Sequence, residues 1–229
     1  MIYETCPLLD ELSWIKHGFY GADNPHAMTK GLSGFHAFTA TFPKTLFLKQ
    51  THSEDIVTDT DDLSKVADAS ITDKTNLALA VKTADCCPIL LVCTQSRLIA
   101  AVHAGWRGAL NNITGKAVQR LIEHGAKANH IIAAIGPSIA QQSMAVMDDV
   151  HDQFMQQQPD KSVFFIPFED RWKMDVGGIV QQQLKDFGVE TVWRSKTDTF
   201  TNPDYSSFRR YSKDKTLPDA RNIAVIVKT

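Results

Sequence analysis

The sequence predicts an α/β protein, with a single domain over residues 1–229 in which helices flank layers of mixed β-sheet. Short apolar runs alternate with segments whose apolar residues recur at helical spacing, as is typical of α/β proteins. Two of the apolar runs are joined by a short polar turn, which indicates an antiparallel pair and a sheet that is not purely parallel. With 229 residues, 43% of them hydrophobic, the chain can bury a substantial core without disulfides.

The expected strands are short apolar runs bounded by turn or charged residues. In chain order they are residues 77–82, 88–93, 98–102, 131–135, 189–194 and 222–227. The polar residues 95–97 form the expected hairpin turn, and His103 stands where the strand after that turn ends. The first 50 residues show no equally regular pattern.

Three stretches repeat apolar residues every three to four positions, as amphipathic helices do. They cover residues 113–122, 147–158 and 176–187. Gly125 and Gly188 follow the first and third stretches, at positions where glycine commonly ends a helix. The chain contains no internal repeat, long linker or low-complexity tract, which favours one domain.

Composition and charge argue against several classes of partner. The formal net charge is −2 and lysine and arginine form no run of five, so we expect no nucleic-acid partner. No uninterrupted apolar segment approaches the roughly 20 residues that a membrane span requires, and no signal-peptide pattern is visible. Of the four cysteines, the adjacent Cys86 and Cys87 would form a strained ring if joined. We therefore expect a cytoplasmic protein with no membrane partner, whose oligomeric state the sequence does not indicate.

Three short motifs contain the residues best suited to chemistry: Gln50-Thr51-His52, Thr83-Ala84-Asp85-Cys86-Cys87-Pro88 and His103-Ala104-Gly105-Trp106-Arg107-Gly108. A single histidine is usually a solvated or structural residue, but His52 and His103 each stand at the edge of a predicted strand, beside turn residues. Two neutral imidazoles and one thiolate leave a four-coordinate zinc with an open position, as catalytic zinc requires. Gly105 and Gly108 predict a tight backbone turn where a ligand would approach.

The thiolate can come from either of two adjacent cysteines. If residues 83–87 are extended, alternate side chains face opposite sides, so only one of Cys86 and Cys87 reaches the site. The other would be a small buried hydrophobe, as free cysteines often are. Asp85 then faces away from Cys86 unless the chain bends before Pro88, which biases the residue before it away from helical geometry.

Arg107 is a candidate anion-binding residue, because in a turn that enters a helix it can hold an anion beside the helix N-terminus. The alternative is a surface ion pair, which contributes little to stability. For Trp106, packing is favoured over stacking on a purine.

The three motifs, in this order, resemble the signature of the laccase-like, polyphenol-oxidase-type family, whose members are described as zinc-dependent purine nucleoside phosphorylases with adenosine deaminase activity. Residues 135–139 and 207–210 resemble later motifs of the same family, so the resemblance covers most of the chain from His52. It implies a mixed α/β sandwich. It also implies metal ligation by His52, Cys86 and His103, which selects Cys86 over Cys87.

The sequence departs from the family pattern at residues expected in the walls of a pocket. These departures are Ser53, Cys87, Met144, Asp198 and Phe208. They leave the implied metal ligands in place and bear on substrate preference.

The resemblance implies a zinc enzyme that cleaves adenosine, inosine, guanosine or methylthioadenosine with phosphate, giving the free base and ribose or methylthioribose 1-phosphate, and that deaminates adenosine. Zinc lowers the pKa of a bound water to about 7, which would provide a nucleophile for C6 of adenosine. Catalytic roles are expected for Cys86 and for Asp85, the latter as a general acid/base or as the carboxylate that orients a ligand histidine. The expected substrate-binding cations are Arg107, Arg210 and Lys49, with Arg209 and Lys82 as further candidates.

Three other functions fit parts of the sequence. The first is a copper-dependent polyphenol oxidase. One cysteine and two histidines can hold a single copper, which is the alternative metal because such a site has a high affinity for Cu(II). A laccase-type oxidase, however, needs four coppers, and the eight histidines contain no His-x-His pair. A metal-free hydrolase that edits peptidoglycan would use Cys86 as nucleophile and His103 or His52 as base, and would keep its activity after chelation. A metal-holding binding module would need a fourth protein ligand, for which no candidate stands out.

Overall fold

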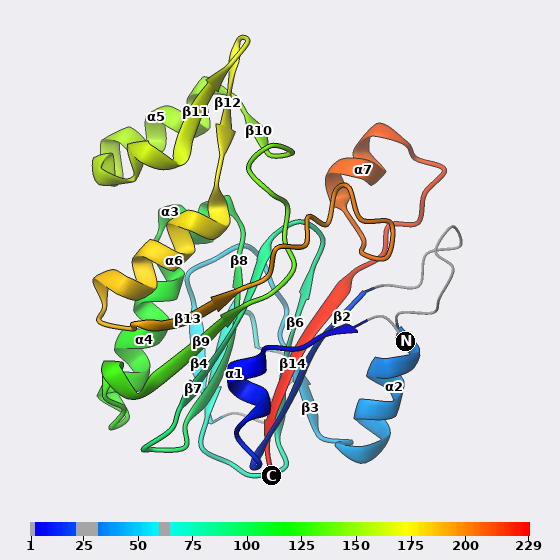
Figure 1. Cartoon of the computed structure of the whole chain (residues 1–229), viewed down its shortest axis with the longest axis vertical. Helices are drawn as coiled ribbons and strands as arrows, with labels where there is room; N and C mark the ends of the chain where they lie inside the picture. The colour runs from blue at the N-terminus through cyan, green and yellow to red at the C-terminus, as the bar shows by residue number, and fades with distance from the viewer. Residues whose placement is uncertain (1–2, 22–31, 60–64) are drawn as a thin grey trace.

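Two β-sheets packed face to face form the centre of the computed structural model, which describes residues 3–21, 32–59 and 65–229 (Figure 1). One sheet has the strand order β1 (Tyr3–Glu4), β2 (Ile15–Tyr20), β14 (Asn222–Lys228), β6 (Ala78–Thr83) and β3 (Thr45–Phe47). The other has the order β13 (Thr191–Arg194), β9 (Ile131–Ile135), β7 (Cys87–Cys93), β8 (Ile99–Ala104), β5 (Ala69–Thr72) and β4 (Ile56–Thr58).

Both sheets mix parallel and antiparallel pairs. Strand β14 pairs antiparallel with β2 and β6, whereas β3 runs parallel to β6. In the six-stranded sheet β7 pairs antiparallel with β8 and β9, and the outer pairs β13–β9 and β4–β5 are parallel. The mixed α/β fold with layered sheets that the sequence predicts is therefore confirmed.

Strand β7 shows why the central strands have continuous apolar sequences. Successive side chains of a strand face opposite sides, and Leu90 and Val92 face the core between the two sheets. Ile89 and Leu91 face the helices on the other side of the same sheet. Because both faces are covered, all seven residues of β7 are buried, and the strand has no polar face.

Helices cover the outer faces of both sheets. The six-stranded sheet packs against α3 (Trp106–Leu110), α4 (Ile113–Glu123) and α6 (Val176–Asp186). The five-stranded sheet packs against the Phe35, Phe38 and Phe42 side chains of the segment that contains α2 (Leu32–Thr41). The short helix α1 (Pro7–Asp10) contacts β2 and β9, and the 3-10 turn η1 (Ala128–His130) leads into β9.

A third, three-stranded sheet projects from one end of the molecule (Figure 1). Its strand order is β10 (Ala145–Val146), β12 (Arg171–Met174) and β11 (Phe165–Phe168), and it packs with α5 (Asp148–Gln157) and the 3-10 helix η2 (Pro159–Phe164). Helix α7 (Phe208–Lys213) lies at the same end of the molecule. The sequence does not predict this small sheet, because its strands are only two to four residues long.

The six strands and three helices expected from the sequence correspond to β6, β7, β8, β9, β13, β14, α4, α5 and α6. Within the described residues, no helix is both long enough and apolar enough to pass through a lipid bilayer.

Candidate active site

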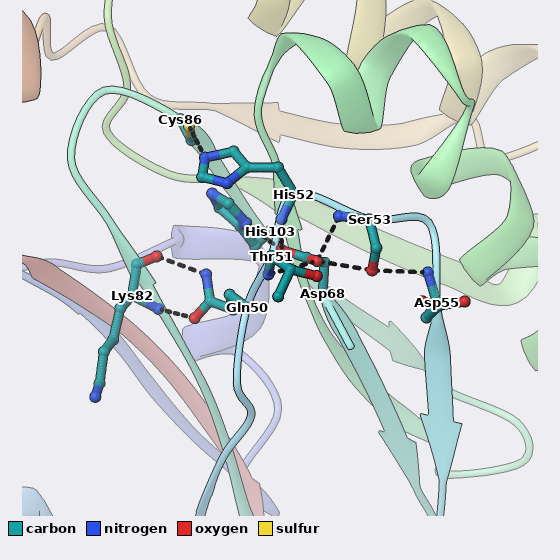
Figure 2. Close-up of polar contacts among 9 residues, drawn as sticks. All are labelled: Gln50, Thr51, His52, Ser53, Asp55, Asp68, Lys82, Cys86 and His103. Atoms are coloured by element: carbon teal, nitrogen blue, oxygen red, sulfur yellow. Dashed lines mark hydrogen bonds and ion pairs between the residues drawn. The ribbon is translucent and has the colours of Figure 1, made fainter. Parts of the chain in front are cut away.

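The side chains of His52, Cys86 and His103 converge at one end of the six-stranded sheet (Figure 2). His52 lies in the loop between β3 and β4, Cys86 directly precedes β7, and His103 is near the end of β8. Because β7 and β8 are antiparallel, with Cys87 opposite Ala104, the start of one strand meets the end of the other. The ligand atoms of the three side chains all lie within 4.8 Å of one another, and His52 Nε2 is 3.9 Å from Cys86 Sγ.

Two residues of this site have left-handed backbone conformations. His52 has a φ of 61° and Asp85 a φ of 85°, a region that residues other than glycine rarely occupy. Such conformations cost of order 1–3 kcal/mol and persist only where the surroundings hold them. At Asp85 the left-handed residue bends the chain just before β7, so residues 83–87 are not extended, contrary to the sequence-based assumption.

The carboxylate of Asp68 holds the loop around His52 in place (Figure 2). It accepts hydrogen bonds from three consecutive backbone N–H groups, those of Thr51 at 3.1 Å, His52 at 3.1 Å and Ser53 at 2.6 Å, and from Ser53 Oγ at 2.8 Å. Asp68 is fully buried. Burial raises the pKa of this carboxyl group, but the hydrogen bonds from His103 and from the loop outweigh burial and lower the pKa to about 2.

Asp68 also orients the second histidine. Its Oδ1 lies 2.7 Å from Nδ1 of His103, a residue that is only 3% exposed. A histidine that donates Nδ1–H to a carboxylate presents Nε2 to a metal or a substrate. One buried carboxylate therefore positions two of the three candidate ligands, although it comes from neither ligand's motif.

Gly105 leaves room for two of the three candidate ligands, Cys86 and His52. A Cβ atom at this position would lie 3.0 Å from Cys86 Sγ and 3.0 Å from Cδ2 of His52. The close approach of its backbone to Cys86 and His52 therefore favours glycine, because a larger residue would push these side chains aside. The expected tight turn occurs at Gly105, the single residue between the end of β8 at Ala104 and the start of α3 at Trp106, but the expectation is wrong for Gly108, which lies within α3.

The Cys86 thiol and the His103 ring influence each other's protonation. Burial raises the pKa of Cys86, but the charge of His103 and hydrogen bonds from His103 and His52 outweigh burial and lower it from 9.0 to about 6. Burial lowers the pKa of His103, but the Cys86 thiolate and Asp68 outweigh burial and raise it to about 9. At a pH between these two pKa values, the metal-free site holds the Cys86 thiolate beside the His103 imidazolium.

The donor set fits a metal ion. Donors bound at about 2.0–2.3 Å to one tetrahedral ion lie about 3.3–3.8 Å from each other, so the three side chains need only small shifts to share one. Two imidazoles and a thiolate suit zinc or copper better than magnesium or calcium. Among the described residues, the cluster of potential metal ligands consists of these three side chains. A four-coordinate ion held by them would keep one position open to substrate or water.

We expect metal affinity to rise with pH, because binding requires the Cys86 thiolate and a neutral His103. Between pH 6 and 9 the metal displaces one proton from His103, so the association constant should rise about tenfold per pH unit. Below pH 6 Cys86 is also protonated, and the dependence should become steeper. Zinc competition titrations against a chromophoric chelator of known pH dependence measure this slope, and a flat profile from pH 6 to 9 would contradict it.

The Asp85 carboxylate binds Thr199 and the start of α7 instead of a histidine. Its carboxylate accepts hydrogen bonds from Thr199 Oγ1 at 2.8 Å, Ser207 Oγ at 2.9 Å and the backbone N–H of Arg209 at 2.7 Å. The interpretation that Asp85 orients a ligand histidine is wrong, because Asp68 makes that contact. A proton-transfer role for Asp85 stays a prediction.

A cavity of about 890 Å³ contains the three candidate ligands in its wall. Six cationic side chains line the same cavity: Lys82, Arg107, Arg171, Arg209, Lys213 and Arg221. Among the described residues of the wall, Asp85 is the one carboxylate, and three donors already occupy its oxygens. This excess of positive charge favours an anionic ligand.

The predicted substrate-binding cations have different environments. Arg107 lines the cavity as the second residue of α3, with its guanidinium 4.3 Å from the centre of the Trp106 ring. Lys49 forms a backbone bridge with Val66 and is not among the described residues of the cavity wall. The guanidinium of Arg210 donates to backbone carbonyl groups of the loop before α7, those of Thr199, Phe200, Asn202 and Tyr205. Its neighbour Arg209 faces the cavity instead.

Sequence reasoning missed Asp68 and Arg171. Asp68 is a lone acidic residue between Ala67 and Ala69, next to the buried strand β5. A charged residue there is a signal, because carboxylates are almost never fully buried unless paired. Arg171 follows two acidic residues in a polar turn, and no feature of the sequence separates it from surface arginines.

Comparisons with known proteins found a matching family model and similar proteins. A family model described as "Multi-copper polyphenol oxidoreductase laccase" matches residues 12–227. A purine nucleoside phosphorylase of Rickettsia conorii is 39% identical over 189 residues, covering 80% of this chain and 78% of that protein. The adenosine deaminase RL5 of an unknown prokaryote is 41% identical over 87 residues, covering 38% of this chain and 33% of that protein. The crystal structure of the Bacillus licheniformis hypothetical protein YfiH has the same fold, with a TM-score of 0.80 at 23% identity over 95% of this chain and 94% of that one.

Proposed function

The chain belongs to the multi-copper polyphenol oxidoreductase laccase family, and from this premise we propose that it is a metal-dependent purine nucleoside phosphorylase that also deaminates adenosine. The observation that carries the proposal is the cavity that joins a His-Cys-His donor set to an excess of cationic side chains. The substrates are adenosine, inosine, guanosine or methylthioadenosine, together with phosphate.

Phosphorolysis suits the composition of the cavity. A phosphate oxygen forms a bond to C1′ while the bond from C1′ to the purine nitrogen breaks, and the purine leaves with the electron pair and takes up a proton. The cationic side chains hold the phosphate. The apolar side chains of the wall exclude water and accommodate the purine: Leu48, Trp106, Met144, Met147 and Phe208.

His52, Cys86 and His103 would hold the metal, for which we propose zinc. When bound, zinc is a Lewis acid that lowers the pKa of water to about 7, which suits replacement of the 6-amino group of adenosine by hydroxyl with release of ammonia. Asp68 keeps His103 in the orientation that presents Nε2 to the ion.

Incubation of metal-analysed protein with adenosine and with inosine, with and without phosphate, tests the proposal. We expect hypoxanthine and ribose 1-phosphate from inosine only when phosphate is present, and inosine plus ammonia from adenosine without it. Intact nucleosides in all reactions of zinc-loaded protein would contradict the proposal.

A thiol hydrolase is a second candidate. Cys86, His103 and Asp68 place a thiolate, an imidazole and an orienting carboxylate in succession, as in cysteine hydrolases. Chelation separates the two candidates, because a thiol hydrolase keeps its activity after metal removal, whereas the zinc enzyme loses it and regains it with added zinc.

We expect Arg107→Met to weaken phosphate-dependent cleavage while the melting temperature changes little. The residue is exposed in the cavity wall, with its guanidinium over the ring of its neighbour Trp106. Loss of one charged hydrogen bond to phosphate should lower kcat/KM about 10- to 100-fold. An unchanged dependence of the rate on phosphate would assign the anion to other cations of the wall.

A further inference from the structure

Two arginines from distant parts of the chain line the same cavity. Arg171 begins β12 in the small projecting sheet, and Arg209 lies in the first turn of α7. The two elements lie at the same end of the molecule (Figure 1).

Hydrogen bonds hold both the backbone and the guanidinium of Arg209. Its backbone N–H donates to the buried carboxylate of Asp85 at 2.7 Å. Its guanidinium donates to the carbonyl oxygen of Ala145 at 2.6 Å and lies 3.8 Å from Sδ of Met144. Both guanidinium partners are neutral, so they orient the positive charge without balancing it.

The sheet that holds Arg209 also carries Arg171. Ala145, whose carbonyl binds Arg209, pairs with Lys173 across β10 and β12, two residues from Arg171 along the strand. The only ion pair of Arg171 among the described residues is with the adjacent Asp170 at 3.4 Å, whose side chain is 75% exposed. Such exposed pairs are worth little, and the guanidinium remains available to a ligand.

The two charges are close enough to affect each other. Burial lowers the pKa of Arg209, Asp85 acts in the opposite direction, and the positive charge of Arg171 lowers the pKa further. An arginine nevertheless stays charged in proteins. Two like charges held beside one cavity are stabilised by an anion between them.

We infer that Arg171 and Arg209 together bind the phosphate co-substrate, an assignment that rests on the proposed phosphorolysis. Arginine binds phosphate through parallel N–H···O bonds, and its planar fork suits an anion with several equivalent oxygens. Arg209 is the fixed partner on α7, and Arg171 is the partner that the projecting sheet supplies. The assignment replaces Arg210, whose guanidinium is bound to loop carbonyl groups.

The test compares Arg171→Gln, Arg209→Gln and a control, Arg120→Gln. Arg120 lies on α4 in an exposed ion pair with Glu123, outside the cavity wall. Calorimetric titration with inorganic phosphate gives Kd, and initial rates with inosine give KM for phosphate and for the nucleoside separately. Each cavity variant should raise the phosphate Kd and KM about 10- to 100-fold, raise the inosine KM much less, and leave the zinc content unchanged, while the control matches wild type.

Arg171→Gln is the decisive variant, because Arg209→Gln also removes the hydrogen bond to Ala145 and can disturb β10. Wild-type cleavage that depends on phosphate, combined with an unchanged phosphate Kd in Arg171→Gln, would overturn the assignment and leave the proposed function standing. A zinc-loaded wild-type protein that neither binds phosphate nor cleaves nucleosides with it would overturn both.

Discussion

Replacing Cys86 by serine should abolish stoichiometric zinc binding and, with it, nucleoside cleavage and adenosine deamination. Cys86 is the one thiolate of the donor set, and its lowered pKa, about 6, favours the form that binds metal at neutral pH. Complete zinc sites in small domains are worth about 10–16 kcal/mol, so loss of one of three donors should cost about 3 kcal/mol or more, at least a hundredfold in affinity.

The adjacent cysteine provides a matched control. Cys87 is fully buried and packs in the core between the six-stranded sheet and its helices. Cys87→Ala should retain stoichiometric zinc and lower the free energy of unfolding by about 1 kcal/mol. Zinc content by elemental analysis and thermal melting of both variants separate the two roles. Equal loss of zinc in the two variants would contradict the assignment of the metal to Cys86.

The elements that the sequence predicts are those with a local cause. Strand β7 is recognisable because both of its faces are buried, so its apolar residues run without interruption. His103 could be placed near a strand end because β8 is a similar run that stops at a glycine. Helix α7 and the strands of the projecting sheet are short, and their position depends on contacts with distant segments that no local pattern reveals.

The candidate site, too, can be predicted from local sequence patterns only in part. The three candidate ligands lie in motifs that chemistry and the family resemblance select, but the geometry that unites them depends on Asp68. This carboxylate binds donors 15 to 35 residues away along the chain, a relation that no spacing rule encodes. For a similar reason the sequence points to Arg210 as a substrate-binding cation, whereas its neighbour Arg209 lines the cavity. The direction in which α7 begins decides which of the two adjacent arginines faces the cavity.

Asp68→Asn should weaken zinc binding about 10- to 100-fold, the usual cost of removing a carboxylate that orients a metal-binding histidine. Both oxygens of Asp68 accept hydrogen bonds from N–H groups, Oδ1 from His52 and His103 and Oδ2 from Thr51 and Ser53. An asparagine presents one NH2 group in place of an oxygen, and in either orientation this group faces N–H donors. The His52 loop or the His103 ring must then move.

Acid unfolding provides a readout of the same contacts that needs no metal. The folded-state pKa of Asp68, about 2, lies below its ordinary value of 3.8, so the carboxylate stabilises the fold above about pH 4, and this stabilisation is lost as the pH falls towards 2. Asp68→Asn should lack this component, so the difference in unfolding free energy between wild type and variant should shrink over that pH range.

Asp198→Asn is the matched control for Asp68→Asn. Asp198 is likewise an aspartate that accepts several hydrogen bonds, from the N–H groups of Ala140 and Phe200 and from Ser143 Oγ, and none of these donors is a candidate metal ligand. An asparagine at position 198 can keep both N–H contacts through its carbonyl oxygen and donate its NH2 group to Ser143 Oγ, so Asp198→Asn should change the melting temperature and the zinc affinity little. Asp68→Asn should lower both, because it leaves N–H donors without an acceptor. If Asp68→Asn lowers the melting temperature but keeps wild-type zinc affinity, Asp68 supports the fold alone. A loss of affinity confined to Asp68→Asn would show that one buried carboxylate assembles the candidate metal site from segments that the sequence keeps apart.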